Sequence, residues 1–150
     1  VIIGIVASMA VPRFGIAMDR MEFRSVNRDV ISTLRLARSQ AISEKNEYGV
    51  YFNAGNLTAT FFEKLGTTMN AYEDGTDRVV KIDTLGGVPG ACLDGFGATF
   101  VNSAVIFDPD GSANVGGTLW TVDLTESHVG VGIISILPAT GRISIETYIW

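Results

Sequence analysis

Few residues in this sequence are of the types that carry out catalysis or bind metals. The 150 residues include one histidine, His128, and one cysteine, Cys92. A single cysteine excludes an intramolecular disulfide and a multi-cysteine zinc site. His128 follows Glu126 and Ser127, but a hydrolytic triad needs a marked nucleophile, and the chain contains no G-x-S-x-G elbow. We therefore predict that the protein is not an enzyme and uses no cofactor.

Two acidic segments contain side chains of the kind that hold cations. Residues 108–114 (DPDGSAN) alternate oxygen-bearing side chains with others, as a calcium loop does. An EF-hand loop also needs glycine at its sixth position and glutamate at its twelfth, where this chain has alanine and leucine. Asp108-Pro109-Asp110-Gly111 instead fits a type I β-turn. We expect a turn here and a solvated loop at Glu73, Asp74 and Asp77, with no metal at either.

Charge divides the chain into two parts. The net charge of the whole chain is −5. Residues 1–45 carry seven basic and four acidic side chains, whereas residues 46–150 carry four basic and twelve acidic ones. Because an acidic surface repels phosphate groups, we expect no nucleic-acid partner. The same boundary separates a predicted helical stem, residues 1–45, from a predicted globular head, residues 46–150.

The first eleven residues, VIIGIVASMAV, contain no charged side chain. As a helix they rise about 16 Å, roughly half the ~30 Å hydrocarbon core of a bilayer, so alone they do not span it. They form either a helix buried in a globular core or the second half of a longer apolar segment. The second interpretation is favoured, because a helix that is apolar on all faces is typical of lipid or of a packed bundle. We expect packing in the core of an assembly for Val1, Ile2, Ile3, Ile5, Val6, Met9, Val11 and Phe14.

A joint is predicted directly after this segment. Pro12 removes a helical hydrogen bond and clashes with the preceding turn, and Gly15 weakens the same region. We therefore expect a kink or a local melt near residues 8–13. This joint would let the stem adapt to its packing partners.

A single amphipathic helix is predicted from about Ile16 to Glu44. This segment contains neither proline nor interior glycine, and Asn46 marks its end. Apolar residues recur at steps of four, four, three and four, which forms one stripe that faces the head. The stripe consists of Val26, Val30, Leu34, Ala37 and Ala41, with Met18 and Ile42 extending it.

The other faces of this helix carry arginines. We expect them to pair with Glu22 or Asp29 of the helix, or with acidic residues of a neighbouring head. In an assembly, a basic stem that faces an acidic head would help to set the register between subunits. These residues are Arg20, Arg24, Arg28, Arg35 and Arg38.

From Tyr48 onward the sequence alternates short apolar runs with glycine-rich turns, which is typical of antiparallel sheets. No second helix is predicted, and residues 66–78 and 86–98 are expected to be loops. The fold class is therefore α+β, with one long N-terminal helix packed on an antiparallel β head. The predicted strands are residues 48–53, 57–62, 79–85, 105–107, 119–124, 131–137 and 142–149.

Four segments, in this order, resemble type IV pilin-like proteins, specifically the H-type (FimT-like) pseudopilins. Residues 1–14 are similar to the second half of their hydrophobic segment. Residues 29–42 (DVISTLRLARSQAI) resemble their helix motif L-x-x-A-R-S-x-A-I. Val105–Gly111 resembles their F-x-x-x-G turn, and residues 140–145 (TGRISI) resemble their T-G-R-[IV] strand. The resemblance covers nearly the whole chain.

The resemblance implies a structural subunit of a type IV pilus or a type II secretion filament. The family's cleavage glycine, methylated phenylalanine and assembly glutamate do not occur in the sequence, and we expect them about ten residues upstream of Val1. The implied partners are further copies or other pilins, together with an assembly platform and ATPase in the bacterial inner membrane. The implied location is that membrane before assembly and an extracellular or periplasmic filament afterwards.

Two other functions are open at this stage. A minor pilin at a filament tip would act as a receptor for DNA or for a surface, and a DNA receptor would need a basic patch on the head. A membrane-anchored enzyme would depend on His128 or Cys92.

Overall fold

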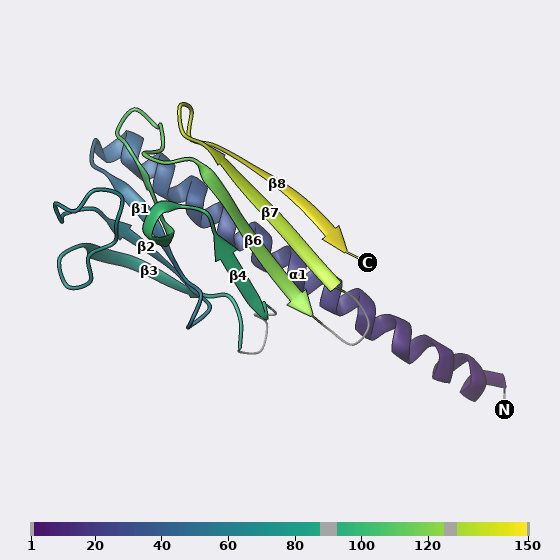
Figure 1. The fold of residues 1–150 in the computed structure, drawn as a ribbon. Coiled ribbons are helices and arrows are strands. Elements are labelled where there is room, and N and C mark those ends of the chain that lie inside the picture. The colour runs from purple at the N-terminus through teal and green to yellow at the C-terminus, as the bar shows by residue number, and fades with distance from the viewer. Residues whose placement is uncertain (1, 88–92, 125–128, 150) are drawn as a thin grey trace.

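The computed structural model describes residues 2–87, 93–124 and 129–149, and for residues 2–13 and 149 it describes the backbone alone. His128 and Cys92, as well as Val1, lie outside the described residues. One helix, α1 (Ile2–Glu44), is followed by eight strands and a short 3-10 turn, η1 (Val101–Ser103). Figure 1 shows α1 running along the strands and extending beyond them at its N-terminal end.

The strands form two antiparallel sheets of four strands each, in the orders β3-β2-β1-β5 and β4-β6-β7-β8. The predicted α+β class is therefore confirmed. The first sheet consists of β1 (Tyr48–Asn53), β2 (Thr58–Glu63), β3 (Arg78–Thr84) and β5 (Ala104–Phe107). The second consists of β4 (Gly95–Ala98), β6 (Gly117–Leu124), β7 (Val129–Leu137) and β8 (Arg142–Ile149).

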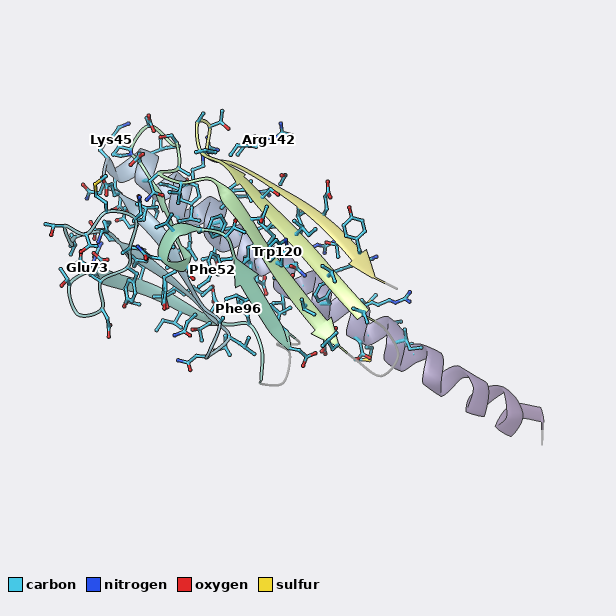
Figure 2. All side chains as sticks on the ribbon, in the orientation of Figure 1. Lys45, Phe52, Glu73, Phe96, Trp120 and Arg142 are labelled. Atoms are coloured by element: carbon cyan, nitrogen blue, oxygen red, sulfur yellow. The ribbon has the colours of Figure 1, made fainter. Side chains whose placement is uncertain are left out.

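Strand β4 lies in a segment that was expected to be a loop. Its four residues, GFGA, include two glycines, which are rare in strands and conceal the alternation of side chains. It is nevertheless paired with β6, and Phe96 from β4 meets Phe52 from β1 with ring centroids 6.1 Å apart. Phe52 also stacks near Phe100. Figure 2 shows Phe52 and Phe96 side by side where the two sheets meet, so these rings join the sheets into one core.

The predicted apolar stripe of α1 is confirmed from Val26 to Ala41, where each of its members is buried. Its predicted extensions are wrong, because Met18 and Ile42 are exposed. The sheets no longer cover α1 at Met18, and Ile42 lies two residues from the C-terminal end of the helix. The sequence pattern also missed four members of the buried helix surface, which are Phe23, Asn27, Ile31 and Thr33.

Two glycines of β7 allow α1 to approach the second sheet closely. A Cβ added at Gly130 would lie 3.1 Å from the ring of Phe23. At Gly132 it would lie 2.5 Å from the hydroxyl of Thr121 and 2.6 Å from the side-chain oxygen of Asn27. The distances at Gly132 are shorter than real Cβ contacts, so a side chain there would displace Asn27 and Thr121, and at Gly130 the ring of Phe23 would have to move by a few tenths of an ångström.

Three side-chain hydrogen bonds fix α1 on the head. Thr121 Oγ1 donates to Asn27 Oδ1 at 2.6 Å. Within the helix itself, Asn27 Nδ2 also donates to the carbonyl of Phe23 at 2.9 Å. Thr33 Oγ1 donates to Asp83 of the first sheet at 2.9 Å. Arg38 Nε donates to the carbonyl of Gly111 at 2.8 Å. Each bond forms at only one rotation of the helix about its axis and at one position along that axis. Together the bonds fix the register of the helix against both sheets.

Helix α1 continues through Pro12 without a break, so the predicted local melt near residues 8–13 is wrong. The missing N–H of a proline removes one hydrogen bond, and the bonds of the neighbouring turns are sufficient to continue the helix. The helix also shows no sharp bend in Figure 1. The role of Pro12 and Gly15 as a joint remains a prediction.

Truncating the buried stripe should destabilise the whole fold. Leu34 is fully buried, and Leu34→Ala should lower the free energy of unfolding by about 3 kcal/mol, because it opens a cavity where helix and sheet meet. Leu36, two residues away, is 46% exposed, and Leu36→Ala should change it by less than about 0.5 kcal/mol. Denaturant unfolding of the full chain in detergent measures both values. Equal losses in the two variants would contradict this packing.

Candidate assembly surface of the helix

Burial of α1 by the head ends at Phe23. Toward the N-terminus from there, three large apolar side chains are exposed to 72%, 52% and 72%, namely Phe14, Met18 and Met21. Their spacing of four and three residues puts them on one face of the helix. Met21 and Phe23 are about 200° apart around the helix, so this exposed stripe faces away from the head. Exposed apolar side chains that gather on one face indicate an interaction surface.

The stripe borders the apolar segment predicted to pack in the core of an assembly. The backbone of that segment is helical and continuous with the rest of α1. Among the described residues, none of the helices is both long enough and apolar enough to cross a membrane. Phe14 is exposed, as a packing residue would be before assembly. The packing role remains a prediction for Phe14 as it does for Ile2, Ile3, Ile5, Val6, Met9 and Val11.

The arginines of the helix do not behave alike. Arg38 is half-buried, and its Nε donates to the carbonyl of Gly111. It also lies beside a second turn, because a Cβ added at Gly141 would be 3.0 Å from Arg38 Nε. It therefore ties α1 to the turn at Gly111 and lies close to the turn at Gly141. Nothing in the spacing of the helix indicated this role. The other four are exposed, and within the described chain no ion pair joins them to Glu22 or Asp29; they are Arg20, Arg24, Arg28 and Arg35.

The segment 108–114 forms the turn that its sequence predicts. The N–H of Gly111 donates to the carbonyl of Asp108 at 2.8 Å, and Gly111 has a positive φ of 87°. The N–H and the hydroxyl of Ser112 both donate to Asp110 Oδ1, and these two bonds lower the pKa of the Asp110 carboxyl. The acidic side chains are thus bound by their own loop. In the part of the chain that the structure describes, no cluster of three or more His, Cys, Asp or Glu is arranged to hold a metal.

The other acidic segment is not the solvated loop that was expected, because it surrounds a buried lysine. Lys64 Nζ lies 3.0 Å from Glu73 Oε1 and 3.2 Å from Asp77 Oδ2, and the Lys64 side chain is only 5% exposed. Asp77 also accepts the N–H groups of Leu65, Gly66 and Glu73. Burial alone would raise the pKa of Asp77, but these three N–H donors and the ammonium of Lys64 outweigh it and lower the pKa.

This cluster folds the loop between β2 and β3 onto the outside of the first sheet. Tyr72 of the loop stacks on Tyr51 of β1 with ring centroids 5.2 Å apart, and it also contacts Phe62 of β2 at 4.9 Å. Figure 2 shows Glu73 at the end of the head opposite the N-terminus of α1. No local pattern indicated this arrangement, because the lysine and its acidic partners are nine and thirteen residues apart.

One long helix that extends beyond an antiparallel β head is the architecture of type IV pilin-like proteins. The family model described as "Type II transport protein GspH" matches residues 27–134, and the chain belongs to this family. Members of such families are structural subunits and not enzymes. The resemblance to H-type pseudopilins in the sequence is therefore confirmed.

Solved structures show the same fold. The type IV minor pilin FimU of Pseudomonas aeruginosa PAO1, in space group P21, aligns with a TM-score of 0.63 at 17% identity, covering 85% of this chain and 90% of FimU. A second crystal form of FimU, in space group P65, gives a TM-score of 0.57 at 17% identity, covering 82% and 91%. A search of curated proteins gave no match.

Because Lys64 is buried, we expect the stability of the fold to depend on its partner Asp77. Asp77→Asn should lower the free energy of unfolding by about 3 kcal/mol at neutral pH, because it removes one of the charges that compensate the buried ammonium. Asp74→Asn, at an exposed position in the same loop, should cost less than about 0.5 kcal/mol. Both are measured by denaturant unfolding.

The pKa values of Glu73 and Asp77 are lowered from ordinary values of 4.5 and 3.8. The stability that these carboxylates contribute is therefore complete above those values and is lost as the pH falls through the lower folded-state values. Stability should decline below about pH 4 in the unmodified chain and less steeply in Asp77→Asn. Parallel declines in both would contradict the role of Asp77.

Proposed function

We propose that this protein is a structural subunit of a type IV pilus-like or type II secretion filament, and that it assembles with further copies or other pilins through the N-terminal half of α1. The observation that carries this proposal is the end of self-burial at Phe23, beyond which large apolar side chains are exposed on the face away from the head. The head thus leaves this part of the helix available to partners.

The mechanism is physical and not chemical. Before assembly, the apolar segment of α1 resides in the inner membrane of a bacterium, where lipid covers it. An assembly platform then transfers it into a helical bundle, in which neighbouring helices replace the lipid. Each large apolar side chain that is removed from water contributes about 1.5–3 kcal/mol, which keeps a bundle of such helices together. The heads face outward in an extracellular or periplasmic filament.

Charge adds a second contribution to this assembly. Arg20, Arg24, Arg28 and Arg35 are exposed and have no acidic partner within the described chain. The head has an excess of acidic residues, and it uses Lys64, Arg78 and Lys81 in ion pairs with its own acids. A neighbouring head can therefore offer carboxylates to the stem. The contact sets the register between subunits more than it adds affinity.

A charge on the apolar stripe should block assembly. Met21→Lys should reduce the amount of the chain in sheared filaments at least about fivefold, because an unpaired ammonium is costly to bury between helices. Met69→Lys is a matched control, since Met69 is 82% exposed on a loop of the head. Immunoblots of sheared filaments and of whole cells, from bacteria with the assembly machinery, give the ratio. Similar incorporation of both variants would contradict the proposed surface.

The charge contacts should make filament stability depend on salt. Raising the ionic strength from about 0.05 M to about 1 M should speed the dissociation of isolated filaments, because screening weakens contacts between exposed charges. Arg28→Gln should reduce this dependence. Arg142→Gln, which removes an exposed arginine from the head instead, should leave it unchanged. Dissociation rates that do not respond to molar salt would rule out the charge contact.

A further inference from the structure

The outer face of the first sheet carries a groove of about 850 Å³. Side chains alternate along a strand, and Val50 and Phe52 of β1 point into the core shared with α1. Tyr51 and Asn53 therefore point to the opposite face, where they line the groove together with Thr58 of β2. The volume lies within the range of about 300–1,000 Å³ that is usual for ligand sites. The groove faces away from the helix.

The groove is nearly neutral, and its lining is part polar and part apolar. Six of its residues have asparagine, threonine or serine side chains, which donate or accept hydrogen bonds, and Ile82 and Ala71 add apolar surface. Neither lysine nor arginine lines it, and Asp74 supplies its one carboxylate. Tyr51 and Tyr72 add aromatic surface. The pKa of Tyr72 is raised by burial and by its hydrogen bond to Asp74, so its hydroxyl stays protonated.

Both walls of the groove are fixed before any ligand arrives. On one side, the Lys64 cluster holds the loop that carries Tyr72 and Asp74. On the other side, Asn102 and Ser103 both have a φ of 54°, a strained conformation for residues other than glycine. The Asn102 side chain donates to the carbonyl of Asn70 at 3.2 Å, which links the two walls. A groove held in this way avoids much of the entropy cost of binding.

This lining selects among ligand classes. An anion or a nucleic acid would meet a carboxylate and no basic side chain. An acyl chain would leave the polar groups without partners. A peptide that binds by strand addition needs a sheet edge, and this groove lies on a sheet face. A neutral molecule rich in hydroxyl groups satisfies the amides and hydroxyls, and the C–H faces of its rings pack on tyrosine.

We propose that this groove binds a neutral oligosaccharide. The site is independent of filament assembly, because it lies on the face of the head opposite α1 and uses no residue of the helix. In a filament whose helices form the core, the same groove would face outward. It would give the subunit an adhesive function in addition to its structural one.

Binding is tested with the full chain in a zwitterionic detergent that contains no sugar, because glycoside detergents would compete. Chitotriose, cellotriose and maltotriose are the probes, each titrated by calorimetry. At least one should bind with a dissociation constant below about 1 mM. Thr58→Arg, which fills the groove, should weaken binding at least about tenfold. Asn56→Ala changes an exposed turn residue of the same groove and should weaken binding about threefold. Because this variant only shortens a side chain, its result does not depend on whether the fold accommodates the arginine of Thr58→Arg.

Thr147→Arg is the matched control, since Thr147 is an exposed strand residue on β8 outside the groove. It should leave the affinity within about twofold. The proposal is overturned if none of the three probes binds with a dissociation constant below about 1 mM, if Thr58→Arg and Thr147→Arg weaken binding equally, or if a sulfated trisaccharide binds more tightly than the neutral ones. None of these results bears on filament incorporation, which is measured separately.

Discussion

Both sheets of the head pack against one and the same face of α1, between Phe23 and Ala41. Because two sheets share this one stripe, it limits which side chains each sheet can place against the helix. Strand β7 has glycines where it crosses the helix, since larger side chains would meet Phe23 and Asn27. The buried polar atoms of that region must find partners, and Asn27 does so with Thr121. The stripe ends at Phe23, and the large apolar side chains between Phe23 and the N-terminal end of the helix are not covered by the head.

The charged groups divide into those that hold the subunit together and those that do not. Lys64, Asp77 and Arg38 are buried or half-buried and have partners within the head or between head and helix. The exposed arginines of α1 have no acidic partner inside the described chain. Because exposed charges contribute little to the stability of a single molecule, these arginines are free to serve the proposed contacts between molecules. Folding and the proposed assembly would then depend on separate sets of residues.

Much of this architecture could be predicted from the sequence, since it rests on local periodicity. The repeat from Val26 to Ala41 predicted the buried face, and the apolar runs at residues 131–137 and 142–149 predicted the strands β7 and β8. Features that depend on distant partners could not be predicted. The strand character of β4 appears only with its pairing to β6, and the burial of Asp77 depends on Lys64. The exposure of Met18 depends on where the sheets end, which no local pattern encodes. The groove beside Tyr51 is formed by segments far apart in the chain, so residue spacing did not indicate it.

The direction of α1 relative to the strands has a mechanical consequence. Figure 1 shows the helix lying lengthwise along β6 and β7. A pull on the stem along its axis therefore loads the contact between helix and head in shear, and the bonds of Asn27, Thr33 and Arg38 bear tension together and not one after another. If the head were attached only by its tip, its contacts with the helix would break one after another. Attached along its length, it resists traction as one unit, as a subunit of the proposed filament would need to do.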